Sequence, residues 1–491
     1  MDRNNGANGM SAGTVEFPFI GPDDSNRVTD VSAQKTVNLY LNLDYKQKPK
    51  LYTCPGLKQF ALLGGIARSN GVVFGDNGYI VADDKLKKAT DTGVVTEIGT
   101  LNTSGGRCQL AAGRDYLFIV DGTDGYTYDG STFAVVADVD LTQDSNGASA
   151  PPTSCIYLDG YFIVNKSGTD EYAISSLEDP TAWATLDFAT AASDPDDAIA
   201  VAANFKDLYV LGSETTQVAN NTGNADFPFE FYPGGTIEYG CASAYSVAQT
   251  PDGLFWLAVT KYGKVQVIQV QKFNAQPVSG GQYGIDWELS QLDKVDDAIA
   301  WVYSYGEHTI YHITFPAAQR SWEYFIESGV WIERESHDDY VSIGRYRGAG
   351  HLYLNRKQLI ADYANGKLYE LDFDVFDEDG EIMRRIRRAQ CVERNHRRIN
   401  HRMIELEMEC GKGTVSGQGS DPQIMLRYSD DGGYVWSSED WRGVGALGNY
   451  QTVVRWRNRG QSRERIYEVV MTDPVPMTLI RADGQFEICD Y

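Results

Sequence analysis

Short aromatic or β-branched segments, each preceded by a polar turn, recur along the first three quarters of the chain. Seven such segments begin at Asn77, Arg114, Asp159, Lys206, Asp252, Glu307 and Gly350, with the sequences NGYIVAD, RDYLFIVD, DGYFIVN, KDLYVLG, DGLFWLA, EHTIYHIT and GHLYLNR. Their starts are 37, 45, 47, 46, 55 and 43 residues apart. A period of about 40–50 residues is typical of β-propeller blades. The pattern therefore predicts an all-β fold built on a β-propeller of six or seven blades.

The turns between these segments suit tight hairpins, because Asp-Gly, Asn-Gly and Gly-Lys steps favour the positive φ that such turns require. One four-stranded sheet cannot cover both of its faces, whereas sheets packed around an axis bury them and expose only short edges. We expect TVEFPFIG, from Thr14, to add a strand to the last blade and close the ring. An array of β-sandwiches with coincidental spacing is the alternative architecture.

Changes in pattern divide the chain into three parts. Residues 1–30 are predicted to form an extended arm, and residues 31–376 the propeller. The segment LDFDVFDEDGEIMRRIRRAQ, from Leu371, switches from acidic to basic and marks a boundary. Beyond it, segments such as HRMIELEMEC and RIYEVVMT alternate in the way that antiparallel strands with one buried face do. Residues 377–491 are therefore expected to form an additional C-terminal antiparallel β domain.

The net charge of −25 is distributed unevenly. From Glu381 to Tyr491 there are 17 Lys+Arg and 16 Asp+Glu, so the totals of 43 and 68 leave 26 basic and 52 acidic residues elsewhere. An acidic surface repels the phosphate backbone, so we expect no sequence-specific DNA binding by that part. Solubility alone is the alternative explanation of the acidic charge.

No pattern predicts a catalytic, cofactor-binding or metal-binding residue. The seven cysteines are far apart and never form C-x-x-C, which favours assembly in a reducing cytoplasm over disulfides or zinc. His308 and His312 share one side of a predicted strand but have no evident third ligand. The acidic cluster from Asp372 to Asp379 lacks EF-hand spacing, and GKGT at Gly411 lacks a glycine that phosphate loops require. Among 68 acidic residues no carboxylate pair for glycoside hydrolysis stands out.

Membrane insertion and secretion are not expected. The N-terminal residues MDRNNGANGMSAG contain no apolar segment of a secretion signal. No apolar run approaches the length of about 18 residues that a membrane-spanning helix needs.

The segment SDDGGYVW fits the Asp-box pattern, with Ser429, Asp431, Gly433 and Trp436 in place. In this motif a carboxylate and a hydroxyl hold a β-hairpin turn while the tryptophan anchors it in the core. Sialidases also carry the motif, but a hairpin is shared far more widely than a chemistry. We interpret these four residues as structural.

Two basic stretches are the strongest candidates for an interface. The residues of interest are Arg384, Arg385, Arg387, Arg388, Arg397 and Arg398 in the first, and Arg455, Arg457 and Arg459 in the second. The planar guanidinium group pairs with carboxylates across an interface and equally with phosphate. Because the remainder of the protein is strongly acidic, we favour subunit or partner docking over DNA contact. A solvated basic face is the third interpretation.

A combination of longer segments carries a family resemblance. These segments run in order from about residue 34 to 475 and include QKTVNLY, LYTCPGLKQF, WATLDFATAASDPDD, IEYGCASAYSVA, ITFPAAQRSWEY, DPQIMLRYSDDGGYVWSSEDW and WRNRGQSRERIYEV. The chain resembles the packaged-DNA stabilisation proteins, also called tail accessory factors or tail nozzle proteins, of short-tailed bacteriophages (podoviruses) related to those of Salmonella. It departs from them in its first 30 residues and in LNLDYKQKPK, from Leu41.

The resemblance implies a non-enzymatic structural protein of the virion tail, assembled in the host cytoplasm. Such proteins form a sixfold ring below the portal and the head-to-tail adaptor, extend the DNA channel and help to retain packaged DNA. Their implied partners are further copies of the chain, the adaptor, a tail needle or tip, and tail fibres or tailspikes. Phage DNA passes without sequence-specific contact. A virion-borne propeller that degrades or binds polysaccharide is the alternative function.

Overall fold

The computed structural model describes residues 15–25, 33–42, 49–190, 196–224, 227–281, 284–338, 342–389, 392–393 and 397–489. Strands dominate these residues, with one short helix, α1 (Asp286–Ser290), and two 3₁₀ turns, η1 (Val139–Leu141) and η2 (Ala244–Ser246). The chain divides into two compact units: unit 1 comprises residues 1–56, 337–342 and 373–491, and unit 2 comprises residues 57–336 and 343–372. The predicted all-β fold class is confirmed.

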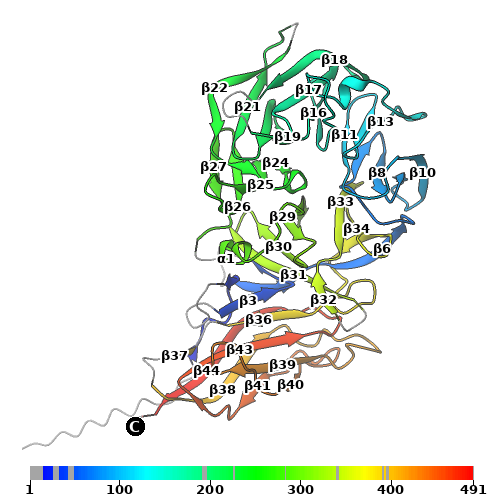
Figure 1. Ribbon diagram of the computed structural model, residues 1–491. Coiled ribbons are helices and arrows are strands. Elements are labelled where there is room, and N and C mark those ends of the chain that lie inside the picture. Colours follow the sequence, from blue (N-terminus) through cyan, green and yellow to red (C-terminus); the bar gives the residue numbers. More distant parts are fainter. Residues whose placement is uncertain are drawn as a thin grey trace, which may run out of the picture. The chain divides into compact units, whose positions relative to one another are not determined.

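Unit 2 is a β-propeller in which antiparallel meanders follow one another around a ring (Figure 1). The first blade consists of β7 (Val72–Phe74), β8 (Asn77–Ala82), β9 (Lys85–Ala89) and β10 (Val95–Thr100), and the second of β11 (Gln109–Ala112), β12 (Leu117–Val120), β13 (Gly125–Tyr128) and β14 (Phe133–Val135). The third blade consists of β15 (Cys155–Leu158), β16 (Tyr161–Asn165), β17 (Glu171–Ser176) and β18 (Asp179–Thr190). The fourth consists of β19 (Ala198–Asn204), β20 (Asp207–Gly212), β21 (Thr216–Asn221) and β22 (Phe229–Ile237).

The ring continues with one five-stranded sheet, one further meander and one four-stranded sheet. The five-stranded sheet consists of β23 (Gly240–Cys241), β24 (Ala248–Thr250), β25 (Gly253–Val259), β26 (Val265–Gln271) and β27 (Asn274–Pro277). The further meander consists of β28 (Ile299–Tyr305), β29 (His308–Phe315), β30 (Arg320–Phe325) and β31 (Val330–Asp338), with β32 (Ser342–Arg345) beside β31. The last sheet consists of β33 (Gly348–Leu354), β34 (Lys357–Asp362), β35 (Lys367–Asp372) and β6 (Gly56–Leu62). Six blades are thus separate sheets, and β28 to β31 repeat the same strand order. The prediction of a propeller of six or seven blades is confirmed.

The blades pack face to face, which explains why their inner strands are apolar on both sides. All four residues of β12, LFIV, are buried. One side of this strand places the Phe118 ring 5.5 Å from the ring of Phe162 and 5.7 Å from that of Trp183, in the next blade. The other side contributes Leu117 and Ile119 to a cluster with Tyr79 and Val81 of the preceding blade. Burial on both faces produces continuous hydrophobic runs rather than an alternating pattern.

The ring is closed by β6 and not by the segment from Thr14 that the sequence analysis predicts for this role. β6 fills the outermost place beside β35, because its residues Phe60 and Ala61 pack onto the last blade and the first. Thr14 lies outside the described residues. The next two residues form β1 (Val15–Glu16), which pairs with Gly484 and Asp483 in unit 1.

The expectation that these dipeptides form tight hairpin turns is confirmed at one Asp-Gly step and wrong at one Asn-Gly step. Asp159 and Gly160, between β15 and β16, have φ of 50° and 89°, as a type I′ turn requires. Asn77 and Gly78 instead lie inside β8, and Gly75 (φ 60°) makes the preceding turn. A Cβ at Gly78 would lie 2.4 Å from Leu352 Cδ2, so this glycine permits close packing between blades.

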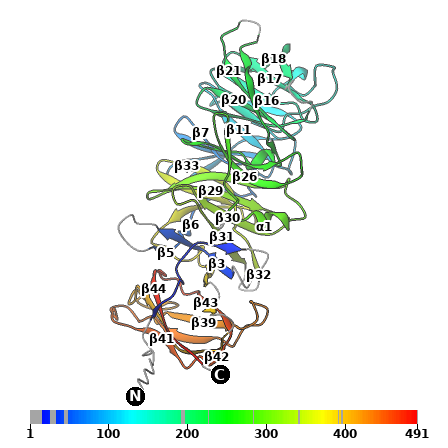
Figure 2. The same ribbon diagram turned by 90° about the vertical axis from the view of Figure 1, so that its left-hand side faces the viewer.

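Unit 1 is a sandwich of two antiparallel sheets. One has the order β4 (Leu39–Asn42), β5 (Lys50–Thr53), β44 (Leu479–Ile488), β38 (Ile399–Met408), β41 (Val454–Arg457), with β1 and β42 (Gln461–Ser462) beside it. The other has the order β3 (Ala33–Val37), β36 (Arg385–Arg388), β43 (Glu464–Met471), β39 (Gln423–Ser429), β40 (Asp440–Gly443), with β2 (Asp24–Ser25) and β37 (Val392–Glu393) beside it. Figure 2 shows β39, β43 and β41 in this unit.

Strands β3, β4 and β5 belong to unit 1, whereas the sequence analysis assigns residues from 31 onward to the propeller. Their apolar residues explain the difference, since Val37 packs with Ile386, Met425 and Val470 in the core of the sandwich. Residues on both sides of the propeller sequence therefore build one unit.

Candidate docking surface

Arg387 is completely buried and binds the N-terminal segment inside unit 1. Its Nε donates to the carbonyl oxygen of Phe19 at 2.6 Å, and Nη1 donates to the carbonyl of Pro22 at 2.9 Å and to Thr36 Oγ1 at 2.8 Å. Nη2 donates to Gln34 Oε1 at 2.5 Å. Because these bonds occupy the guanidinium group, Arg387 is not available to a partner.

Arg385 is buried on the same side of β36 as Arg387. Its guanidinium group donates to the carbonyl oxygens of Met471, at 3.4 Å, Val475, at 2.5 Å, and Asp473. Burial lowers the pKa of Arg385 to about 10, with the nearby carboxylates acting in the opposite direction. Arg384, one residue earlier, is partly exposed, and its carbonyl accepts a bond of 2.9 Å from Asn38 Nδ2. Docking by Arg385, like that by Arg387, is excluded by these internal contacts.

Arg388 takes part in an ion-pair network across the sheet. Its Nε and Nη2 lie 3.0 and 2.8 Å from Glu468 Oε2, and Arg427 Nε lies 2.6 Å from Glu468 Oε1. Glu468 is fully buried, while both arginines are partly exposed. Both guanidinium carbons lie within 5 Å of the Trp436 ring centroid, at 4.9 and 4.7 Å. The network stabilises the sheet and presents only the outer parts of the arginines.

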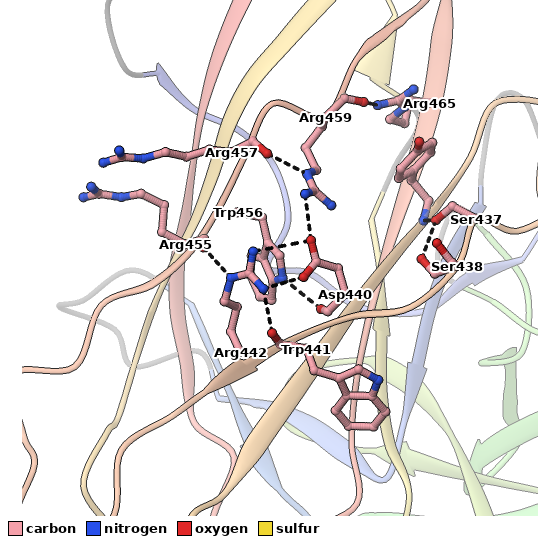
Figure 3. A network of polar contacts seen from close by, with 11 residues as sticks. Ser437, Ser438, Asp440, Trp441, Arg442, Arg455, Trp456, Arg457, Arg459 and Arg465 are labelled. Atoms are coloured by element: carbon pink, nitrogen blue, oxygen red, sulfur yellow. Dashed lines mark hydrogen bonds and ion pairs between the residues drawn. The ribbon is translucent and has the colours of Figure 1, made fainter.

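The second basic stretch lies at the edge where both sheets end. β41 pairs only with β38, and β40 pairs only with β39, among the described strands. Side chains join the two edges: Arg459 Nη2 lies 2.7 Å from Asp440 Oδ2, and Trp456 Nε1 donates to the carbonyl of Asp440 at 2.9 Å. Arg442 pairs with Asp440 and donates to the carbonyl of Arg455 at 3.1 Å. Figure 3 shows this network. Asp440 therefore holds Arg459 in an internal role.

Arg455 and Arg457 extend to one side of β41, away from Asp440 (Figure 3). Arg455 is paired with Glu405 on β38 at 2.6 Å. Arg457 is exposed, and its side chain has no carboxylate partner among the described residues. Arg397 and Arg398, before β38, are also exposed. Arg397, Arg398 and Arg457, which we call the exposed arginines, are the residues of the predicted interface whose side chains are exposed.

The Asp-box segment forms the predicted turn after β39. Ser429 Oγ donates to Asp431 Oδ1 at 2.7 Å and accepts from the Gly433 amide at 2.9 Å, while the Val435 amide donates to Asp431 Oδ1 at 2.9 Å. These bonds lower the pKa of the Asp431 carboxyl, the Ser429 hydroxyl contributing most. The tryptophan differs from the expectation: Trp436 is only partly buried, because it covers two arginines instead of entering the core.

Ser429→Ala is expected to lower the free energy of unfolding by about 1–2 kcal/mol, since the buried hydroxyl holds the turn and its loss leaves the Gly433 amide unpaired. Urea denaturation of the variant and of Ser438→Ala, an exposed serine in the same loop, measures the difference. Equal midpoints for the two variants would show that the turn does not depend on this hydroxyl.

The two histidines considered as metal ligands lie in the core of unit 2. His312 is fully buried, stacks on Trp301 with ring centroids 4.2 Å apart, and lies 3.2 Å from Glu323 Oε1. Burial lowers the pKa of His312, although Glu323 opposes the shift. Within the described part of the chain no group of three or more His, Cys, Asp or Glu side chains is arranged to hold a metal ion. Cys391 lies outside the described residues.

Sequence reasoning identified the arginines but not the acidic residues that bind them. Glu468 and Asp440 are the main examples, and Asp430 adds a third by binding the buried Arg465 at 2.6 and 2.7 Å. Apart from Arg442, which lies on β40 with Asp440, their arginine partners lie 19 to 80 residues away in the sequence. No local spacing indicates such pairs.

The comparisons with known proteins identify a family. A family model described as "Bacteriophage P22 Gp10, beta-propeller" matches residues 15–376, and a second, "Bacteriophage P22 Gp10, beta-sandwich", matches residues 384–487. No curated protein matches the chain.

None of the helices in the described ranges is long and apolar enough to cross a membrane.

Solved structures with similarity to the chain share little sequence identity with it. The Neurospora crassa Pan2 WD40 domain is 8% identical with a TM-score of 0.40, and the match covers 65% of this chain and 96% of that one. A virginiamycin B lyase from Staphylococcus aureus is 9% identical with a TM-score of 0.40, covering 65% and 99% of the two chains. Similarities at this level support no functional inference.

Proposed function

Because the chain belongs to the bacteriophage P22 Gp10 family, a family of phage structural and stabilisation proteins of the virion, we propose that it is a ring-forming subunit of a short-tailed phage tail. Six copies would form the nozzle below the portal and adaptor, extend the DNA channel and help to retain packaged DNA. The observation that carries this proposal is that two models of one phage family match the chain in order, over residues 15–376 and 384–487. The proposed role is non-enzymatic.

The distribution of charge supports contacts between copies. Outside residues 381–491 the chain carries a net charge of −26, while the sandwich uses many of its carboxylates to neutralise its own arginines. The exposed arginines therefore face acidic surfaces on other copies or on the adaptor. One basic and one acidic surface on the same subunit suit a head-to-tail contact that closes into a ring. An acidic propeller also disfavours adhesion of DNA that passes through the channel.

Charge reversal at the exposed arginines tests the proposal. The double variant Arg398→Glu and Arg457→Glu is expected to reduce assembly at least tenfold, because it replaces attraction with repulsion at a contact repeated around the ring. Mass photometry of the protein with its adaptor, compared with the adaptor alone, measures the fraction of particles that has gained about six times the chain mass of 54.5 kDa.

Arg114→Glu is the matched control, since Arg114 is an exposed arginine in a propeller turn. It is expected to assemble normally. Normal assembly of the double variant would eliminate the exposed arginines as the contact. A wild-type chain that stays monomeric with its adaptor would eliminate the ring itself.

Attachment of tail fibres or tailspikes and of a tail needle or tip forms part of the same proposal. The alternative of a carbohydrate-binding propeller would favour an aromatic shelf on one surface. Phe205 and Tyr262 are highly exposed, at 78% and 87%, but they lie in the β19–β20 and β25–β26 turns. These are the first and second turns of their blades, at opposite ends of the strands, so the two rings support a common sugar site poorly.

A further inference from the structure

The sandwich has an open edge at β40 and β41. Each of these strands pairs on one side only, β40 with β39 and β41 with β38, among the described strands. Trp441 on β40 and Val453, just before β41, are exposed, at 43% and 57%. Unpaired backbone groups beside exposed apolar side chains invite another chain to add a strand. An edge of this kind requires protection if the copies are to stay apart there.

One hydrogen bond identifies the outward carbonyl groups of β41. The amide of Asn458 donates to the carbonyl oxygen of Arg402, on β38, at 2.8 Å. Because the C=O and N–H groups of one trans peptide point in opposite directions, the carbonyl of Arg457 points away from β38. Arg455 lies two residues earlier in the same strand, so its carbonyl points to the same side. Both oxygens are therefore acceptors at the open edge.

The carbonyl group of Trp441 points outward from β40 for the same reason. The Val444 amide donates to the carbonyl oxygen of Pro422, just before β39, at 2.8 Å. The carbonyl of Gly443 therefore points away from β39. Trp441 precedes Gly443 by two residues in β40, and its carbonyl shares that direction.

Two arginines cap these three carbonyl oxygens of the open edge (Figure 3). Arg442 Nε donates to the carbonyl oxygen of Arg455 at 3.1 Å, and Arg442 Nη1 donates to that of Trp441 at 2.7 Å. Arg459 Nε donates to the carbonyl oxygen of Arg457 at 3.1 Å. An incoming strand would have to displace these guanidinium groups before its own amides could bond to the edge.

Asp440 holds both guanidinium groups in place. Its Oδ1 pairs with Arg442, and its Oδ2 lies 2.7 Å from Arg459 Nη2. Trp456, which is fully buried in β41, fixes the backbone of Asp440 by donating from Nε1 to its carbonyl oxygen at 2.9 Å. The side chain of Asp440 is only partly exposed. One carboxylate therefore positions both caps.

We propose that Asp440 guards the edge of the sandwich against strand addition, and that the strand it excludes is β41 of a second copy. An incoming β41 needs the carbonyl oxygens of Arg455 and Arg457 as acceptors, and both are occupied while the carboxylate holds the two arginines. Two identical strands that pair antiparallel make a closed two-fold contact, so loss of the guard yields a dimer. The guard belongs to unit 1 alone and does not depend on the proposed role in the tail.

Asp440→Asn tests the guard, because it removes the charge that holds both arginines and preserves the size of the side chain. Sedimentation velocity of the full chain at micromolar concentration, without the adaptor, measures the fraction at twice the chain mass of 54.5 kDa. Dimerisation about tenfold tighter than that of the wild-type chain is expected, since two acceptors become free to bond to the incoming strand.

Glu405→Gln is the matched control. It also removes one carboxylate from an ion pair with an arginine, Arg455, but leaves the guanidinium groups that cap the edge in place. Its dimerisation is expected to equal that of the wild-type chain.

A proline on β41 separates strand addition from other kinds of association. The amide of Arg457 points away from β38 with its carbonyl group, and an edge strand tolerates proline where its N–H would face outward. Adding Arg457→Pro to Asp440→Asn is therefore expected to restore wild-type behaviour. Arg459→Met, which uncaps only the carbonyl of Arg457, is expected to dimerise more than the wild-type chain and less than Asp440→Asn.

The proline and methionine variants keep the proposal open to refutation. Wild-type behaviour of Asp440→Asn, or of Arg459→Met if Asp440→Asn does not fold, overturns it. Equal dimerisation of Asp440→Asn with and without the proline also overturns it, because the contact then does not use the edge of β41.

Discussion

Replacing Arg387 by methionine is expected to lower the free energy of unfolding of unit 1 by about 3–5 kcal/mol. The guanidinium group is fully buried and makes four hydrogen bonds to Phe19, Pro22, Gln34 and Thr36. Methionine fills much of the space but donates no hydrogen bond, so several buried acceptors lose their partners. Three of those acceptors, on Phe19, Pro22 and Gln34, attach the N-terminal segment to the sandwich.

Urea denaturation and limited proteolysis measure the two consequences of this change. The variant should unfold at lower urea, and trypsin should cleave the N-terminal segment before it cleaves the strands of the sandwich. Arg457→Met is the matched control, since its side chain is exposed and a surface change of this kind alters stability by about 0.5 kcal/mol or less. Equal stability of the two variants would mean that the N-terminal segment does not contribute to the sandwich.

Acidification from pH 7 to pH 5 is expected to remove about 2 kcal/mol of stability from unit 1 through His401 alone. His401 is fully buried, and its ring nitrogens lie 2.8 Å from the hydroxyls of Ser462 and Tyr467. Burial, with a smaller effect from the charge of Arg465, lowers its pKa from 6.5 to about 3.

The sign follows from proton binding. Between pH 6.5 and about 3 the unfolded chain binds a proton at this histidine and the folded chain does not. The stability is therefore complete above pH 6.5 and decreases as the pH falls, by about 1.4 kcal/mol per unit. Unit 2 should change in the same direction, because burial also lowers the pKa of His312.

Hydrogen exchange of peptides from β38 measures the effect in unit 1, once rates are corrected for the intrinsic dependence on pH. The variant His401→Gln keeps polar atoms at the site but does not titrate, so its stability should change less between pH 7 and pH 5. The two proteins are compared by the change in their free energy of unfolding per pH unit and not by the free energy itself, because the substitution lowers the latter. An unchanged slope in the variant would contradict the assignment to His401.

The blades were predictable because each depends on a pattern that is local in sequence. One meander contains its own strands and turns, and its apolar segments recur at a regular spacing, as in RDYLFIVD and DGYFIVN. The Asp-box turn was predictable for the same reason, since Ser429, Asp431 and Gly433 interact within five residues. The position of Trp436 was not, because the arginines that it covers come from β36 and β39.

The strand that closes the ring required the tertiary structure. Both TVEFPFIG and GLKQFAL have the composition of a strand, and only the pairing of β6 with β35 and the packing of Ala61 against the last blade distinguish β6. The assignment of β3, β4 and β5 to the sandwich has the same origin, since Val37 contacts residues about 350 to 430 positions later.

By itself, the sequence determined the fold class, the repeated blades and the phage family, because these depend on periodic or contiguous segments. Only the tertiary structure decided which arginines are accessible. Arg385, Arg387, Arg397 and Arg457 have the same side chain and similar neighbours in sequence, yet the first two are buried and the last two exposed. The physical reason is that burial and charge compensation depend on strands brought together by folding, such as β43 with Glu468 and the N-terminal segment with Phe19.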